Sequence, residues 1–352
     1  MNPLFTKNLL QWNAGENTRS MPWKGEKDPY KIWLSEIILQ QTRVEQGLAY
    51  YHKFVDTYPT IHQLAAAPDQ QVFKLWEGLG YYTRCKNLLQ TARYVSQALN
   101  GRFPETYDSI KTLKGIGPYT AAAIASFAFN QPHAVVDGNV TRVLARYFGV
   151  ATPVNSSAGK KLFSQVAESL LPRNEPAAFN QAIMDFGAVI CKPKQPLCNI
   201  CVHSNACEAF RHGWIAVLPA KDKKPPRTKR VFNYYVIESE DSVYIRKRSG
   251  KDIWENLYEF VLEEPELQPY PGLFNDKQLK SILGPTRADI TGISDTFSQQ
   301  LTHQTIEGRF ISVRIYDPLF IQQGYRPVLK NDLANYPFPR FITSWLAEKA
   351  SV

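Results

Sequence analysis

Four of the five cysteines lie within one short segment, and their spacing constrains the fold of this 352-residue chain more than any other feature. Cys191, Cys198, Cys201 and Cys207 are separated by six, two and five residues, whereas Cys85 stands apart. An odd count with four clustered residues favours metal ligation over a disulfide framework. Four thiolates at this spacing suit one zinc ion or one iron–sulfur cube, although the long first gap differs from zinc ribbons and from ferredoxins. We therefore expect a metal-bound loop, with unrelated buried cysteines as the alternative.

The composition indicates a folded protein with a polyanionic partner. The formal net charge is +9, and each phosphate that a lysine or arginine neutralises releases counterions. Hydrophobic residues make up 44% of the chain, which at this length is enough for two domains that need no disulfides. We expect neither a secretion signal nor a membrane span, and hence a cytoplasmic location. We also expect a monomer.

The hydrophobic pattern divides the chain into two regions. Residues 1–216 are predicted to be helical, with a stripe at alternating steps of three and four made up of Ile37, Gln41, Val44, Leu48, Tyr51 and Val55. We place an exposed linker at residues 217–230, because this segment is basic, contains prolines and has few apolar side chains. Beyond it, alternating segments at 231–239, 242–248 and 308–317 predict strands. Residues 231–352 therefore form a second, α+β domain in this interpretation.

A glycine-rich turn at residues 113–118 leads into a small, apolar helical segment. Gly115 and Gly117 permit a tight turn and close backbone approach, and Pro118 suits the first position of the helix. Such a turn directs backbone N–H groups at a phosphate, so it is typical of a hairpin that grips DNA without reading its sequence. A plain turn between two helices would use the same glycines.

Two carboxylates are candidates for chemistry. Asp137 lies at the start of a predicted helix, where an ordinary N-cap is the simplest interpretation. Glu36 is surrounded in sequence by isoleucine and leucine, an unusually apolar setting, although a surface glutamate on an amphipathic helix is the alternative. If Glu36 is buried, its pKa rises, and the neutral acid can then donate a proton to a leaving group.

Together these motifs resemble the helix-hairpin-helix DNA glycosylases of the endonuclease III and MutY superfamily. The cysteine spacing is similar to the single-cluster motif of that superfamily, and residues 22–44, 78–84 and 180–187 are very similar to its adenine-specific MutY family. The resemblance covers the chain from about residue 20 to the last cysteine. It implies a mainly α catalytic domain with one 4Fe–4S cluster on the four clustered cysteines, followed by a Nudix-like α+β domain.

For the chemistry, the resemblance implies that Glu36 is the general acid. Asp137 would stabilise or capture the sugar cation that forms as the base leaves, which a lone carboxylate can do. Tyr119 and Asn139 would be supporting groups near the sugar. Tyr119 also stands where relatives with lyase activity carry a Schiff-base lysine, and a phenol cannot form that imine.

For binding, the resemblance implies an adenine pocket and several DNA contacts. The pocket would be lined by Trp23, Lys24, Leu39, Thr42 and Asp185. Relatives also carry arginine at the position of Lys24 and glutamate at that of Asp185, so the reach of these contacts differs.

The remaining contacts would be made to the duplex itself. Gln41 and Tyr81 would wedge into it beside the flipped base, which partly restores the lost stacking. Gly115 and Gly117 would bind phosphates, and Lys192 and Lys194 could do so from the cysteine loop unless they are plain surface lysines.

In the second domain, residues 243–248 and 253–260 resemble the carboxy-terminal domain of the MutY family. A glutamate-rich Nudix box is absent from the sequence, so we expect no pyrophosphohydrolase activity. The loop that inspects 8-oxoguanine would be formed by Leu301, Thr302 and His303. Gln299 replaces a histidine that is common in relatives, and a strand-edge loop without function would have much the same sequence.

The partner predicted by this resemblance is double-stranded DNA that contains adenine opposite 8-oxoguanine or guanine. The predicted reaction is hydrolysis of the adenine N-glycosidic bond without efficient strand cleavage. Two alternatives remain at this point. One is a glycosylase-lyase for oxidised pyrimidines, against which Tyr119 and the extra domain argue. The other is a non-catalytic, iron–sulfur DNA-binding or redox-sensing protein.

Overall fold

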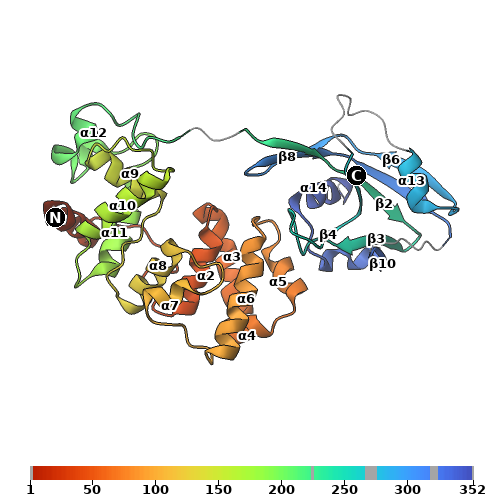
Figure 1. The fold of residues 1–352 in the computed structure, drawn as a ribbon, viewed down its shortest axis with the longest axis horizontal. Coiled ribbons are helices and arrows are strands. Elements are labelled where there is room, and N and C mark those ends of the chain that lie inside the picture. The colour runs from red at the N-terminus through yellow and green to blue at the C-terminus, as the bar shows by residue number, and fades with distance from the viewer. Residues whose placement is uncertain (1–2, 223–225, 266–275, 318–323, 351–352) are drawn as a thin grey trace. The chain divides into compact units, whose positions relative to one another are not determined.

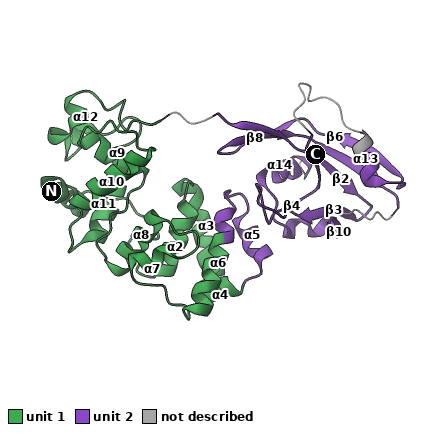
Figure 2. Cartoon of the chain, in the orientation of Figure 1, with its two compact units in different colours: residues 1–66, 87–224 green, residues 67–86, 225–352 purple. Residues whose placement is uncertain are grey.

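The structure is a computed structural model that describes residues 3–222, 226–265, 276–317 and 324–350 (Figure 1). The chain divides into two compact units (Figure 2). The first contains residues 1–66 and 87–224, and the second contains residues 67–86 and 225–352. A boundary drawn along the sequence cannot produce this division, because residues 67–86 group with the distant carboxy-terminal half. Within the described residues, no helix is long and apolar enough to cross a membrane.

The first unit is helical, as the sequence predicts. Its helices are α1 (Pro3–Gly15), α2 (Pro29–Leu39), α3 (Val44–Thr57), α4 (Ile61–Ala66), most of α6 (Thr83–Ala98), α7 (Tyr107–Lys111), α8 (Pro118–Phe129), α9 (Gly138–Tyr147), α10 (Ser157–Leu170), α11 (Pro176–Val189) and α12 (Glu208–Arg211), with short 3-10 turns η1 (Cys198–Ile200) and η2 (Ser204–Ala206).

Helix α2 lies at the centre of its half of this unit because it is apolar on nearly all sides. Asp28 caps its first turn by accepting a hydrogen bond from the Tyr30 backbone N–H at 2.9 Å, and Pro29 supplies the first helical position. Every residue from Ile32 to Ile38 is buried, and α2 packs against α8, which is buried from Thr120 to Ser126. A helix that is hydrophobic all round is expected in a core rather than on a surface.

The predicted continuous stripe from Ile37 to Val55 is wrong in one place. Helix α2 ends at Leu39 and α3 begins at Val44, so two helices carry the stripe. Gln41 lies between them with a φ of 56°, a left-handed backbone conformation that interrupts any helix of L-residues.

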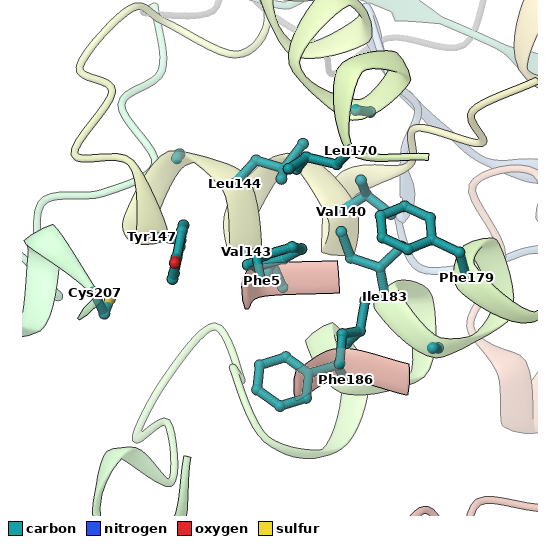
Figure 3. Close-up of a cluster of buried hydrophobic side chains, with 14 of the residues drawn as sticks. Phe5, Val140, Val143, Leu144, Tyr147, Leu170, Phe179, Ile183, Phe186 and Cys207 are labelled. Carbon is teal, nitrogen blue, oxygen red and sulfur yellow. The ribbon is translucent and has the colours of Figure 1, made fainter. Parts of the chain in front are cut away.

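A second core joins the amino-terminal helix to the later helices of this unit (Figure 3). Phe5, Leu9 and Trp12 of α1 belong to the same buried cluster as Phe186 of α11 and Cys207. Each such fully buried aromatic or aliphatic side chain contributes roughly 1.5–3 kcal/mol, so the cysteine loop is secured by an ordinary hydrophobic core.

The second unit is a mixed β-sheet structure with helices. Its elements are α5 (Asp69–Trp76), β1 (Thr228–Val231), β2 (Asn233–Glu238), β3 (Ser242–Lys247), β4 (Tyr258–Glu259), β5 (Val261–Glu263), α13 (Asp276–Leu283), β6 (Ala288–Ile293), β7 (Phe297–Gln300), β8 (Gln304–Gly308), β9 (Phe310–Ile315), β10 (Arg326–Leu329), η3 (Lys330–Asn335) and α14 (Arg340–Ala350). The strands predicted at 231–239, 242–248 and 308–317 correspond to β2, β3 and β9.

Two sheets organise these strands. The larger has the order β10-β3-β2-β9-β6, in which β2 and β9 are parallel and the other neighbours along this order are antiparallel, while β4 pairs with β3 and β5 with β2. The smaller has the order β1-β8-β7, and β7 and β8 form a hairpin. Helix α14 packs its aromatic side on the larger sheet, where Trp345 stacks on Phe310 at a ring distance of 4.6 Å.

Specific contacts attach residues 67–86 to the rest of the second unit. Lys86 forms an ion pair with Glu255 at 2.9 Å, and the Phe338 backbone N–H donates to Glu77 Oε1 at 2.7 Å. Gln70 donates from Nε2 to the Asn335 carbonyl oxygen at 3.0 Å. The turn that contains Tyr81 is therefore held by the second unit.

Candidate active site

A cavity of about 1090 Å³ opens in the first unit and gathers most of the predicted active-site residues. Its wall is built by α2, the start of α8, the loop into α9, α11, and the segment before α2. The predicted residues on this wall are Trp23, Lys24, Glu36, Leu39, Gln41, Thr42, Gly117, Tyr119, Asp137 and Asn139. Motifs that are up to about one hundred residues apart in sequence thus share one concave site.

Glu36 is a carboxyl group in an apolar setting. Its side chain belongs to the buried face of α2, and the residue is 7% exposed. The pKa of Glu36 is raised to about 7, because the effect of burial, together with a smaller effect of the nearby Asp137 charge, outweighs a hydrogen bond with Tyr119 that lowers it. Near neutral pH the side chain is therefore present in both protonated and ionised forms.

Asp137 is the N-cap of α9, so the simpler sequence interpretation holds, and it also lies on the cavity wall. Its Oδ1 accepts from the Val140 backbone N–H at 2.7 Å, and its Oδ2 accepts from Asn139 Nδ2 at 2.8 Å. Burial raises the pKa of Asp137, whereas these hydrogen bonds lower it. The hydrogen bonds stabilise an anion that burial alone would disfavour.

Tyr119 follows Pro118 at the start of α8 and faces Glu36. Burial and the neighbouring carboxylates raise the pKa of its phenol well above the usual value, so the hydroxyl stays protonated. A protonated phenol can donate to the Glu36 carboxylate and thereby fix its orientation. The adjoining Gln40 donates from Nε2 to Thr120 Oγ1 at 3.1 Å, which ties the end of α2 to α8.

Sequence reasoning missed Arg142, which connects the Asp137 region to the cysteine loop. Its side chain donates to Asn139 Oδ1 at 2.8 Å, to the Gly187 carbonyl oxygen at 2.7 Å and to the Cys191 carbonyl oxygen at 2.8 Å. The residue is only 8% exposed. The signal that could have drawn attention to it is a pair of arginines, Arg142 and Arg146, which lie four residues apart and are both buried on α9.

Asp185 lies behind the cavity wall and supports residues that line it. It is fully buried and forms ion pairs with Arg19 at 2.6 Å and with Lys24 at 3.1 Å, and it accepts from Asn17 Nδ2 at 2.9 Å. Arg19 and Lys24 are both on the wall. Sequence reasoning also missed Arg19. Its position on the cavity wall is fixed by the ion pair with Asp185.

The glycine-rich turn joins α7 to α8 as the hairpin interpretation requires. Gly115 has a φ of 76°, and an added Cβ there would lie 2.7 Å from Asn87 Cβ, so the position favours glycine in both backbone and space. Gly117 is the N-cap of α8 and Pro118 its first residue. The first N–H groups of a helix have no partner within it, so this exposed end can bind an anion.

The four clustered cysteines border one small cavity beside Arg146. Cys191 follows α11, Cys198 begins η1, Cys201 follows η1, and Cys207 precedes α12. Arg146 donates to Cys191 Sγ at 3.6 Å, and the Cys207 thiol donates to the Arg146 carbonyl oxygen at 3.4 Å. Among the described residues, no three histidine, cysteine, aspartate or glutamate side chains are placed to hold a single metal ion.

In the second unit, Tyr81 meets the loop that contains the predicted 8-oxoguanine contacts. The hydroxyl oxygens of Tyr81 and Thr302 are 2.9 Å apart and share a hydrogen bond. Thr302 and His303 are exposed and Leu301 is half-buried. Tyr81 is 46% exposed and has a φ of 49°, an uncommon conformation for an aromatic residue. The sequence predicts that Tyr81 and residues 301–303 act at the same DNA lesion, and the fold places Tyr81 next to Thr302.

Comparisons with known proteins identify the class and then the family. Residues 34–169 match the HhH-GPD superfamily of base excision DNA repair proteins. A solved thermostable thymine-DNA glycosylase superposes with a TM-score of 0.55 and 32% identity, over 59% of this chain and 95% of that one.

Among curated relatives, the adenine DNA glycosylase of Buchnera aphidicola subsp. Baizongia pistaciae is 34% identical, over 86% of this chain and 84% of its own. The human adenine DNA glycosylase is 39% identical, over 58% of this chain and 39% of its own. This chain therefore belongs to the adenine DNA glycosylase family within the HhH-GPD superfamily. Family membership favours the adenine branch over the glycosylase-lyase and the non-catalytic alternatives.

The close approach of α11 to Asn139 gives a first prediction. A Cβ added at Gly187 would lie 2.6 Å from Asn139 Cβ and 3.0 Å from its carbonyl oxygen. We expect Gly187→Ala to push α9 and α11 apart, to lower the free energy of unfolding by about 1–3 kcal/mol and to slow adenine excision. Denaturant unfolding and single-turnover kinetics measure both effects. Gly15→Ala, whose Cβ meets nothing within 4 Å, is the control, and wild-type behaviour of Gly187→Ala would refute the packing argument.

Proposed function

We propose that this enzyme hydrolyses the N-glycosidic bond of adenine opposite 8-oxoguanine or guanine in duplex DNA and leaves an abasic site. The observation that carries the proposal is the pairing of Glu36, whose pKa lies at about 7, with the hydrogen-bonded Asp137 in one cavity. One carboxyl group is available as a proton donor and the other as an anion. Such a division of roles between two carboxyl groups is a general sign of acid and base assignments.

In this mechanism adenine leaves the base stack and enters the cavity. Extrusion costs stacking energy, and insertion of Tyr81 and Gln41 beside the emptied position would recover part of it. The left-handed backbone at both residues supports this role, because strained conformations gather where side chains must project from a turn. Trp23 and Leu39 provide apolar surfaces for the purine, and Lys24 and Thr42 provide polar contacts.

Bond cleavage then follows from the two carboxyl groups. Neutral Glu36 donates its proton to a ring nitrogen of adenine while the electron pair of the glycosidic bond moves to the base. The sugar becomes an oxocarbenium ion, which the Asp137 carboxylate stabilises or captures covalently. Water adds to the anomeric carbon, displaces the Asp137 carboxylate where a covalent bond has formed, and gives a proton to the Glu36 carboxylate, which restores the enzyme. Because Tyr119 offers no amine for a Schiff base, the abasic strand stays intact.

For the cofactor, we propose that Cys191, Cys198, Cys201 and Cys207 hold one 4Fe–4S cluster. The four cysteines line one common cavity, and four cysteine thiolates are the usual ligand set of a 4Fe–4S cube. The cluster would supply structural cross-linking of the loop rather than electron transfer, since the reaction moves no electrons between groups. The cluster would lie beside Arg146, next to the hydrophobic core that contains Cys207 and the buried side chains of α1.

We further propose that the second unit is a Nudix-like module that inspects the base opposite adenine. The loop Leu301–His303, named here the recognition loop, is exposed and lies against Tyr81. A side chain next to the wedge is well placed to contact the partner base once adenine has left the stack. The exposed N-terminus of α8 and the lysines of the cysteine loop would bind phosphates on the same duplex.

The pH dependence of excision tests the role of Glu36. Because the acid must be protonated, the single-turnover rate should fall as pH rises through about 7, and by about tenfold for each further pH unit. Below about pH 7, Glu36→Gln should lose about 10²–10⁴-fold in rate while it binds the mispair normally, and this loss relative to the wild type should shrink as pH rises. If Glu36→Gln excised adenine at the wild-type rate, Glu36 would not be the general acid.

The metal content tests the cofactor proposal. Protein purified without oxygen should contain about four iron and four sulfide per chain and absorb visible light, as four thiolates around one cube require. Replacing Cys198 with serine should reduce the iron content, whereas Cys85→Ser, at a buried site away from the cluster, should leave it unchanged. One zinc per chain without iron would contradict the proposal.

The specificity of excision tests the recognition loop. Thr302→Ala combined with His303→Ala should lower excision of adenine opposite 8-oxoguanine by about fivefold or more relative to adenine opposite guanine, because one lost base contact changes discrimination by about 1–3 kcal/mol. Single-turnover rates on both duplexes at one salt concentration give the ratio. Gln300→Ala, an exposed strand residue just before the loop, is the control. An equal loss on both duplexes would mean that the loop supplies affinity only.

A further inference from the structure

We propose that Arg227, at the carboxy-terminal end of the linker, is a positioning residue that sets opposite-base specificity by holding the recognition loop in place. The inference rests on the proposed function of that loop. It assigns a specificity role to a segment that the sequence alone presents as a basic tether.

The recognition loop is a short connection within the β7–β8 hairpin. Gln300 pairs with Thr305 at the last register position, and the Leu301 backbone N–H donates to the Gln304 carbonyl oxygen at 2.8 Å. This bond closes the loop between the strands and leaves the carbonyl oxygens of Leu301 and His303 to other partners. The direction in which Thr302 points depends on what those two oxygens bind.

The linker provides both partners. Strand β1 runs parallel to β8 with Thr228 opposite Gln304, so the chain just before β1 passes beside the loop. Arg227 donates from Nε to the Leu301 carbonyl oxygen at 3.0 Å, and the Thr228 backbone N–H donates to the His303 carbonyl oxygen at 3.0 Å. The loop is therefore clamped at both of its ends by consecutive linker residues.

The two clamps differ in how they respond to substitution. The Thr228 bond is a backbone bond that any residue except proline preserves, whereas the Arg227 bond belongs to a side chain. Thr302, which lies between the two clamped carbonyl groups, shares a hydrogen bond with Tyr81, the proposed wedge residue. Loss of the Arg227 bond frees one end of the loop and lets Thr302 shift relative to Tyr81 without unfolding the hairpin.

Arginine and lysine can be distinguished at this position. The donor is Nε, and a lysine side chain places a methylene group at the equivalent atom, so Arg227→Lys keeps the charge but moves the donor one bond further along the side chain and out of the observed geometry. A role in phosphate attraction would survive this change, whereas a role in holding the loop would not. Lys229 offers a matched control, because it lies two residues further on in β1, is exposed and pairs with Glu307 rather than with the loop.

The experiment measures single-turnover excision from duplexes with adenine opposite 8-oxoguanine and opposite guanine, using the full chain at several salt concentrations. We expect Arg227→Ala and Arg227→Lys to lower the ratio of the two rates by about threefold or more, with little change in excision opposite guanine. Lys229→Ala should weaken DNA binding slightly and keep the ratio. Only Arg227→Ala, and not Arg227→Lys, should reduce the salt dependence of binding.

The outcomes separate this inference from the function on which it rests. If Thr302→Ala with His303→Ala keeps the wild-type ratio, the recognition loop does not read the opposite base, and both proposals fall. If that double variant lowers the ratio but both Arg227 variants keep it, the loop reads the base and Arg227 does not position it. If Arg227→Ala lowers the ratio and Arg227→Lys keeps the wild-type ratio, Arg227 acts through its positive charge, and the positioning role is overturned.

Discussion

The active site depends on the burial of one carboxyl group in a helix that is apolar on nearly every side. Helix α2 places Glu36 in the core against α8, and the shift of its pKa from 4.5 to about 7 corresponds to about 3 kcal/mol against the ionised form. Between these pH values the folded chain holds a proton that the unfolded chain has released, so this group lowers stability as pH rises. Burial of Glu36 therefore lowers the stability of the fold near neutral pH, and it also keeps part of the Glu36 population protonated there.

Asp137, the second carboxyl group on the cavity wall, has a pKa that is raised by burial, and hydrogen bonds to its carboxylate oppose that rise. Asp137 is held by the first turn of α9, and Asn139 and Arg142 link that turn to the backbone of α11 and of the cysteine loop. A change in the cysteine loop would therefore reach Asp137 through a few short hydrogen bonds. Through this connection, the proposed cluster would influence the position of Asp137 without taking part in the reaction.

Much of this arrangement follows from local sequence, and the rest arises from contacts between distant segments. The apolar neighbours of Glu36, the capping position of Asp137, the glycine turn and the alternating strands each carry a local physical signal, and the structure has these features. The assigned roles of these residues remain proposals.

Other features depend on tertiary contacts that a single sequence does not display. The break at Gln41 needs a backbone conformation that periodicity cannot reveal, and residues 67–86 join the second unit through contacts with residues far along the chain. Arg142 and Gly187 become important only because α9 and α11 touch.

The most direct test of the central claim is a carbon-13 NMR titration of the glutamate side-chain carboxyls in the intact protein. One carboxyl should titrate near pH 7 in the wild type and be missing in Glu36→Gln, whereas titration of every glutamate below about pH 5 would contradict the account.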